Sequence, residues 1–196
     1  MILPTEEVWS GGQTGADLGG LVGARAVGYM TGGWAAKGWQ TERGPQPSLA
    51  SFNLRECPDP GYPARTRYNV RDTDGTLLVG DRTSVGSRLT LDLCRQMGRP
   101  HLVVGWTPER GQSPSAAAIE AVRAWLVRHR IRRLNVAGNR ESVAPGIEGA
   151  TAWLVREVLR VDTLRTTVES HPTVQALVRA LAGTVEEVVD AASSPY

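Results

Sequence analysis

The segment SGGQTGAD at residues 10–17 carries the densest set of groups that could bind a ligand. It lies between a predicted strand at 6–10 and a predicted helix. Backbone N–H groups at a helix N-terminus bind anions, glycine lets an anion approach the backbone, and the hydroxyls of Ser10 and Thr14 add donors. The segment therefore predicts a phosphate-binding loop. The structural alternative is a tight turn with Asp17 favourably placed in the first helical turn.

Spacing and composition exclude several common classes of protein. The loop matches neither G-x-G-x-x-G nor G-x-x-x-x-G-K-[ST], so we expect no tight NAD or NADP binding and no standard P-loop. A net charge of +2 does not point to nucleic acid. His101, His129 and His171 are scattered, and Cys57 and Cys94 are the two cysteines, so neither a metal site nor a disulfide framework is predicted. No secretory signal and no run of 18 apolar residues occur, so we expect a cytoplasmic protein that does not enter membranes.

A second group of candidate ligand contacts follows the next predicted strand, at 29–34. Lys37 is the single lysine of the chain and could pair with a phosphate, while Trp34 or Trp39 could stack on a flat heterocycle. The alternative interpretation places both tryptophans in the core and Lys37 in solvent.

Polar residues also follow two later predicted strands, at 75–80 and 134–138. The first is followed by a helix whose opening residues could form a second anion cradle or serve as ordinary caps. After the second, Arg140 could clamp a phosphate bidentately. The candidates at these two places are Gly86, Ser87 and Thr90, then Asn135, Gly138 and Arg140.

The elements that must position these residues alternate between strands and helices. Strands are predicted at 6–10, 29–34, 75–80, 101–106 and 134–138, and helices at 17–25, 64–71, 86–97, 147–159, 173–191 and from Ser113-Pro114 to Arg130. This alternation predicts an α/β fold, a Rossmann-like, doubly wound and mostly parallel sheet with helices on both faces. The loops at 10–17, 81–90 and 138–146 would then share one edge of the sheet, where such folds bind ligands.

The predicted domain spans residues 1–160, and residues 161–196 form a linker and a C-terminal amphipathic helix. Within the domain, residues 35–60 are predicted to be a long irregular stretch. Gly19, Gly20 and Gly23 weaken the first helix by about 1 kcal/mol each relative to alanine, which indicates close packing on the sheet. The C-terminal apolar stripe predicts docking on the domain or on a second copy of the chain.

Several segments together resemble the putative molybdenum carrier family. They are SGGQTGAD at 10–17, GGWAAKGW at 32–39, TRYNVRDTDGTLLVG at 66–80, GSRLTLDL at 86–93, GRPHLVV at 98–104 and LNVAGNRES at 135–142. The family shares a Rossmann-like superfamily with lysine-decarboxylase-like phosphoribohydrolases and DprA-type proteins. The resemblance covers about residues 6–160 and implies binding of molybdenum cofactor or a nucleotide-like ligand at the strand ends.

The resemblance also implies a set of binding residues. Carried over by motif, with Ser10 and Asp17 from the same loop, the set is Ser10, Gly11, Gly12, Gln13, Thr14, Gly15, Asp17, Lys37, Gly86, Ser87, Thr90, Asn135, Gly138 and Arg140. The chain departs from the family pattern at Val85, where a glycine is usual, and at Asn139, where a proline is frequent. Thr90 stands where the phosphoribohydrolase relatives carry their catalytic glutamate, which disfavours hydrolysis.

The sequence therefore predicts a cytoplasmic binding or carrier protein for a small phosphorylated heterocyclic ligand, either molybdenum cofactor or a nucleotide derivative. Its expected partners are that ligand and further copies of the chain. The first alternative is an enzyme that cleaves an N-glycosidic bond, which requires a carboxylate in the cleft. The candidates are Asp17, Glu42, Asp72, Asp92 and Glu141. A sensor of a nucleotide signal is the second alternative.

Overall fold

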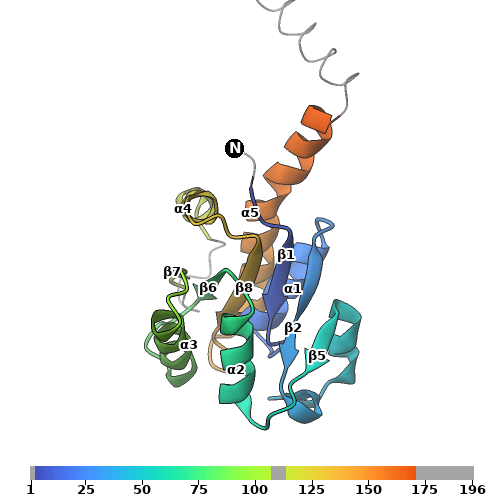
Figure 1. Cartoon of the computed structure of the whole chain (residues 1–196), viewed down its shortest axis with the longest axis vertical. Helices are drawn as coiled ribbons and strands as arrows, with labels where there is room; N and C mark the ends of the chain where they lie inside the picture. Colours follow the sequence, from blue (N-terminus) through green and yellow to red (C-terminus); the bar gives the residue numbers. More distant parts are fainter. Residues whose placement is uncertain (1–2, 107–113, 171–196) are drawn as a thin grey trace, which may run out of the picture. The chain divides into compact units, whose positions relative to one another are not determined.

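The computed structural model describes residues 3–106 and 114–170, and for 161–170 the backbone alone (Figure 1). Residues 3–160 form one compact unit, and residues 161–170 lie outside it. The strands are β1 (Glu7–Ser10), β2 (Met30–Ala35), β3 (Gln40–Thr41), β4 (Gly44–Pro45), β5 (Leu54–Glu56), β6 (Gly75–Val79), β7 (His101–Val104) and β8 (Arg133–Gly138). The helices are α1 (Ala16–Arg25), α2 (Tyr62–Arg71), α3 (Val85–Gln96), α4 (Ala116–Arg128) and α5 (Ile147–Ser170), with short 3₁₀ turns η1 (Lys37–Trp39) and η2 (Pro47–Phe52).

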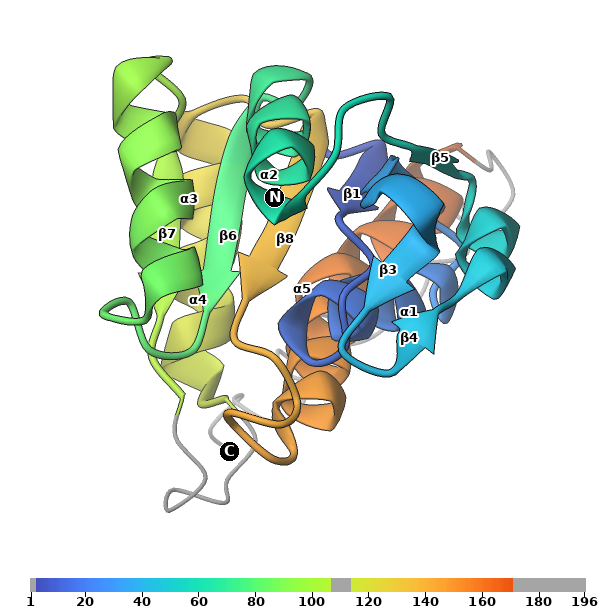
Figure 2. The same cartoon turned by 90° about the horizontal axis from the view of Figure 1, so that it is seen from below.

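Six strands form one parallel sheet in the order β5-β2-β1-β8-β6-β7. The last strand in the chain, β8, lies between β1 and β6, with Val8 and Leu78 paired to Leu134 and Ala137. Helices α1, α4 and the first part of α5 share the main core on one face, while α2 and α3 pack together on the other (Figure 2). The predicted Rossmann-like α/β fold is therefore confirmed.

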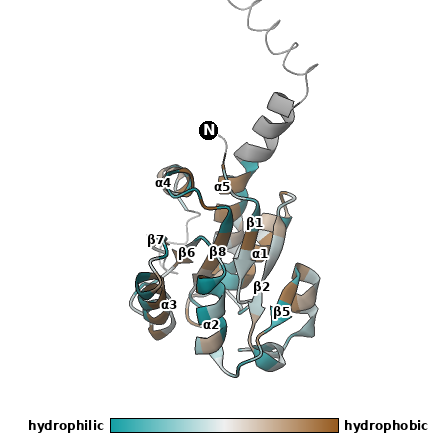
Figure 3. Cartoon of the chain, viewed as in Figure 1, coloured by the Kyte–Doolittle hydropathy of each residue, from teal (hydrophilic) through white to brown (hydrophobic). Residues whose placement is uncertain are grey.

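The central strands supply much of the core. Leu77, Leu78 and Val79 of β6 and Val136 of β8 are at most 1% exposed. A strand buried on both faces reads as a continuous apolar run, which is why the sequence identified these two strands. Figure 3 shows hydrophobic residues along β8 and mainly hydrophilic ones on α2. Burial of each of these Leu and Val side chains of β6 and β8 stabilises the fold by about 1.5–3 kcal/mol relative to the same side chain in solvent.

The glycines of α1 do allow close packing, but only one of them faces the sheet. A Cβ on Gly20 would lie 2.6 Å from Val136 of β8. A Cβ on Gly19 or Gly23 would lie 2.3 Å from a carbonyl oxygen of α5, that of Glu148 or of Ala152. Two of the three glycines therefore serve a helix–helix contact, which local spacing did not reveal.

Residues 35–60, predicted to be irregular, contain short ordered elements instead. Strand β5 pairs with β2 and extends the sheet, while β3 and β4 form a separate antiparallel hairpin. Strands of two or three residues carry no recognisable periodicity, and their formation depends on the neighbouring strand that completes their hydrogen bonds.

Two helix ends differ from the predictions. Ser115, not Ser113, caps α4, because its side chain accepts the hydrogen bond from the Ala118 N–H; Ser113 lies outside the described residues. Helix α5 continues to Ser170, through most of the predicted linker at 161–171, because neither glycine nor proline occurs between Gly149 and Pro172. The predicted helix at 173–191 lies outside the described residues. No helix within the described ranges has the length and apolar character needed to cross a bilayer.

The contact between α1 and α5 predicts an unusual response to alanine. Gly23→Ala should lower the free energy of unfolding by about 1–3 kcal/mol, because overpacking outweighs the gain of about 1 kcal/mol in helix propensity. Gly149→Ala on α5 is the matched control, since a Cβ there meets nothing within 4 Å and should stabilise by about 0.5–1 kcal/mol. Urea denaturation measures both; a Gly23→Ala protein as stable as the control would contradict the packing argument.

Candidate functional site

A cavity of about 410 Å³ lies at the carboxyl ends of the central strands. Three strand-end loops and the start of α2 line it, so the loops after β1, β6 and β8 meet as the fold predicted. The lining residues are Gln13, Asp17, Tyr62, Pro63, Arg65, Thr66, Ser84, Val85, Gly86, Leu89, Thr90, Ala137, Gly138, Asn139, Arg140 and Val143. Its size falls in the range of small-molecule sites, roughly 300–1,000 Å³.

The cavity has a polar floor and a more apolar, exposed rim. Gln13 and Asp17 on the floor are only 4% and 3% exposed. Val85 and Val143 on the rim are 78% and 65% exposed, and Arg140 is also exposed. A ligand would therefore place hydrogen-bonding groups inward and apolar surface against the rim.

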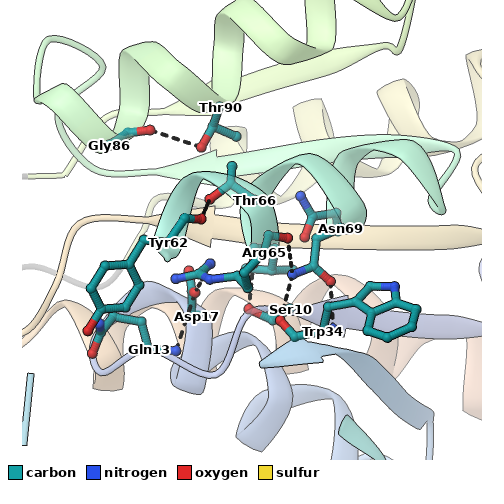
Figure 4. A network of polar contacts seen from close by, with 12 residues as sticks. Ser10, Gln13, Asp17, Trp34, Tyr62, Arg65, Thr66, Asn69, Gly86 and Thr90 are labelled. Carbon is teal, nitrogen blue, oxygen red and sulfur yellow. Dashed lines mark hydrogen bonds and ion pairs between the residues drawn. The ribbon is translucent and has the colours of Figure 1, made fainter. Parts of the chain in front are cut away.

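A buried ion pair forms the centre of the floor (Figure 4). Arg65 Nη1 of α2 lies 2.8 Å from Asp17 Oδ2 of α1, and the Gln13 N–H donates to the same oxygen at 3.3 Å. Burial raises the pKa of the Asp17 carboxyl, while the charges of Arg65 and Arg140 and the Gln13 N–H act against that rise. A buried carboxyl with a raised pKa in a cleft marks a candidate functional residue.

Two buried donor atoms at this ion pair, one on Gln13 and one on Arg65, have no hydrogen-bond partner in the part of the chain that the structure describes. Gln13 Oε1 accepts from the Thr14 N–H at 3.0 Å and from the Glu42 N–H at 2.9 Å. These two bonds fix the amide orientation, and Gln13 Nε2 is left buried with no partner among the described residues. Arg65 Nε is also buried and also has no partner among the described residues. An unpaired buried donor costs about 1–3 kcal/mol. Both residues line the cavity, where a bound molecule could supply an acceptor.

Four consecutive backbone N–H groups of the first loop, those of residues 13–16, have partners within the protein. Besides Gln13 and Thr14, the Gly15 N–H donates to Glu148 Oε2 at 3.3 Å and the Ala16 N–H to the Asn139 oxygen at 3.0 Å. The loop thus offers the cavity the side chains of Gln13 and Asp17, while its N–H groups at residues 13–16 are already engaged.

Packing explains the glycines of the same loop. A Cβ on Gly11 would lie 1.9 Å from Arg65 Nη1, so the guanidinium rests directly on the bare backbone. Gly12 has φ of 69° and faces Leu49 and Leu54, and Gly15 has φ of 81°. Close approach was predicted here, and the neighbour at each position is part of the protein.

The wall of the cavity is formed in part by Tyr62, at the start of α2. The guanidinium of Arg140 lies 5.0 Å from the centre of its ring, and that of Arg65 lies 5.9 Å from it. Cationic groups at these distances are attracted to the ring face. The aromatic surface near the ligand therefore comes from Tyr62, whereas Trp34 and Trp39 do not line this cavity.

Glu42, in the turn between β3 and β4, joins two of the loops around the cavity. Its carboxylate accepts hydrogen bonds from the Thr14 and Ser142 hydroxyls and from the Ser142 N–H at 3.2 Å. Desolvation raises the pKa of Glu42, but these hydrogen bonds and the charge of Arg140 outweigh it, so the pKa lies below 4.5. Glu42 therefore holds the first loop against the loop after β8.

Other predicted binding residues are placed away from the cavity. Ser10 Oγ donates to the Val136 oxygen and Asn135 Nδ2 to Thr76 Oγ1, both inside the sheet. Ser87 pairs with Ser84 at the cap of α3. Lys37 is exposed and donates to the Pro58 oxygen at 3.2 Å.

Trp34 has a structural position rather than one against the cavity. Its indole N–H donates to Asp72, and Asn69 pairs with both its backbone N–H and its carbonyl oxygen. Trp39 packs beside the cluster that contains Leu49 and Leu54. The alternative that both tryptophans belong to the protein's own packing therefore describes them best.

Of the carboxylates considered for a hydrolase, Asp17 lines the cavity, whereas Glu42, Asp72, Asp92 and Glu141 do not. Thr90 also lines it, and its hydroxyl donates to the Gly86 oxygen at 2.9 Å. Among the described residues, no three His, Cys, Asp or Glu side chains gather closely enough to hold a metal ion.

Sequence reasoning missed Tyr62 and Arg65 as cavity residues, and it considered Glu42 only as a carboxylate for hydrolysis, not as a link between two loops. The first two lie on a helix whose side chains reach the cavity only after α2 packs across the sheet from α1. Glu42 lies in a stretch predicted to be irregular. The length of that stretch was the one signal that it has a role.

The chain matches the circularly permutated YpsA SLOG family over residues 8–159. Among solved structures it is similar to the putative molybdenum carrier protein of Syntrophus aciditrophicus SB, at 33% sequence identity and a TM-score of 0.70. That similarity covers 83% of this chain and 97% of the other. No curated protein is similar enough to count as a match. The family match includes every residue that lines the cavity.

The hydrogen bonds of Glu42 predict a pH-dependent contribution to stability. Because its pKa is lowered on folding, that contribution is present above pH 4.5 and is lost as the pH falls through the lowered pKa. Glu42→Gln should cost about 1 kcal/mol near neutral pH, and the difference from the unmodified protein should shrink on acidification. Urea denaturation across this range measures it. Glu120→Gln, at an exposed carboxylate on α4, is the control; equal differences at every pH would contradict the role of Glu42.

Proposed function

We propose, on the premise that the chain belongs to the circularly permutated YpsA SLOG family, that it binds a phosphorylated heterocyclic ligand in the cavity between α2, α3 and the loops after β1 and β8. The mechanism is binding without turnover, as in a carrier. The proposal rests on one observation: the two unpaired buried donors, Gln13 Nε2 and Arg65 Nε, belong to residues that line one cavity.

Different residues of the cavity would contact different parts of the ligand. Gln13 and Arg65 supply hydrogen bonds on the floor, where exclusion of water strengthens them. Arg140 on the rim is free to pair with a phosphate, because no described carboxylate forms an ion pair with it. Tyr62, Val85 and Leu89 offer apolar surface to a ring.

Molybdenum cofactor and nucleotide derivatives both combine a phosphate with a heterocyclic ring, the two groups that these residues would contact. The similar protein from Syntrophus aciditrophicus is called a putative molybdenum carrier, which supports the first as cargo. The cavity residues fit the organic, phosphorylated part of such a ligand. The floor holds donors and one carboxylate, and it has no soft sulfur ligand, because Cys57 and Cys94 do not line the cavity.

A second candidate function has one specific observation in its favour. Asp17 places a buried carboxylate in the cavity, and a carboxylate is what cleavage of an N-glycosidic bond requires. Its Oδ2 is already engaged by Arg65 and Gln13, and Thr90 holds a hydroxyl where the phosphoribohydrolase relatives have their glutamate. These contacts favour binding over hydrolysis.

Binding can be tested through the rim arginine. Arg140→Gln should weaken binding of purine mononucleotides about tenfold to a hundredfold in titration calorimetry, because a charge-assisted hydrogen bond is lost. The remaining affinity should depend less on salt. Arg132→Gln removes the same charge at the opposite end of β8 and should leave affinity unchanged. Equal effects of the two substitutions, or no binding by the unmodified protein, would refute the proposal.

Turnover can be tested separately with the same nucleotides. Incubation with AMP or GMP should release no free base above the buffer rate, because Arg65 and the Gln13 N–H already engage the carboxylate of Asp17. Acid–base assistance of this kind is worth about 10²–10⁴-fold. Chromatography of the reaction mixture measures the base. Steady release that disappears in Asp17→Asn would establish the hydrolase instead.

A further inference from the structure

We infer that the cavity floor recognises a ring edge that carries a keto oxygen beside a ring N–H, so that the protein selects 6-oxopurine over 6-aminopurine nucleotides. This inference rests on the proposed function, and it names the chemical class of the ring. It is carried by the side chains of Gln13 and Asp17, which present one donor and one acceptor to the same cavity.

The donor is Gln13 Nε2, and its orientation is determined by the protein. Because Oε1 accepts from the N–H groups of Thr14 and Glu42, a flipped amide would lose both bonds and bring two donors against the NH₂ group. The hydrogens of the buried Nε2 atom have no partner among the described residues and are available to a ligand. A keto oxygen satisfies it, whereas an amino group would oppose it with a second donor.

The acceptor is the remaining oxygen of Asp17. Arg65 and the Gln13 N–H both donate to Oδ2, and no described residue donates to Oδ1. The Gln13 backbone N–H binds Asp17, and the two residues line the same cavity, so the inference places one ring edge against both side chains. A ring N–H satisfies a carboxylate oxygen, whereas the unprotonated ring nitrogen of a 6-aminopurine would repel it.

The distribution of charge argues that the ring enters first and the phosphate stays at the rim. On the floor the positive charge of Arg65 is already paired with Asp17, and a phosphate there would meet a carboxylate. At the rim, Arg140 is exposed and a Cβ on Gly86, in the first turn of α3, would meet nothing within 4 Å. The rim thus has both the charge and the space for a phosphate, and the floor does not.

Inosine 5′-monophosphate and AMP form a matched pair for the test, because they differ only at the edge that the floor would contact. Titration calorimetry with the full-length protein should give a dissociation constant at least about tenfold lower for inosine 5′-monophosphate, the discrimination expected from two hydrogen bonds to a base edge. Equal affinities, or a preference for AMP, would overturn the inference while leaving the proposed function intact. If neither nucleotide binds, both fail.

Substitutions can then locate the selectivity. In Asp17→Asn the carbonyl oxygen must stay toward Arg65 and Gln13, so the amide NH₂ replaces Oδ1 and the preference should vanish or turn toward AMP. Asp92→Asn, outside this cavity, should retain the preference. Arg140→Gln should weaken the binding of both nucleotides by the same factor, so the ratio of their dissociation constants should stay unchanged.

A second variant protects the test against misfolding. If thermal unfolding shows that Asp17→Asn is not folded, Gln13→Glu keeps the acceptor for Thr14 and Glu42 and replaces the donor with an oxygen. Measured well above neutral pH, it should also lower the preference for inosine 5′-monophosphate. Selectivity unchanged in every folded floor variant would assign it to other residues and overturn the inference.

Discussion

The buried ion pair between Arg65 and Asp17 is the contact on which the arrangement of the cavity depends. It joins α2 to the first turn of α1 beneath the ligand cavity, and the removal of either partner would leave a buried charge, a change that typically costs about 3–5 kcal/mol. Position 11 has no room for a side chain, because the Arg65 guanidinium lies against the backbone of Gly11. The same carboxylate accepts the Gln13 N–H and so determines the path of the loop. One ion pair thereby connects helix packing, loop conformation and the chemistry of the floor.

Close backbone approach is the second constraint, and it places the three strand-end loops near one another. Gly15 lies against the backbone of Asn139, and a Cβ on Gly138 would lie 2.0 Å from the Val79 oxygen. Asn139 in turn accepts the Asp81 N–H at 2.6 Å, which ties the end of β8 to the end of β6. Glu42 completes the arrangement from outside the sheet. The cavity is therefore held by contacts among its own loops, which is the preorganisation that tight binding of a small ligand requires.

The chemistry of the floor is better suited to recognition than to bond cleavage. Most of its polar atoms already have partners, and those that remain are donors fixed by packing, together with one carboxylate oxygen. Such groups distinguish ligands by the penalty for leaving a buried group unpaired. The similarity to the Syntrophus aciditrophicus protein confirms the resemblance to the putative molybdenum carrier family.

The sequence by itself determined the order of strands and helices, the α/β class, and the three loops that meet at the cavity, because these follow from local periodicity and from the handedness of parallel crossovers. It also indicated Gln13, Asp17 and Arg140, since strand-end loops carry the ligand contacts of such sheets. Only the tertiary structure decided that Arg65 pairs with Asp17, that Tyr62 forms the wall and that Glu42 joins two loops. The hydrogen bonds of Arg65 and Glu42 join residues 28 to 100 positions apart, which no local pattern can reveal. It likewise decided which predicted contacts are internal. Ser10, Asn135 and Trp34 have polar groups that neighbouring elements satisfy, and no local pattern distinguishes a donor bound to the protein from one left for a ligand.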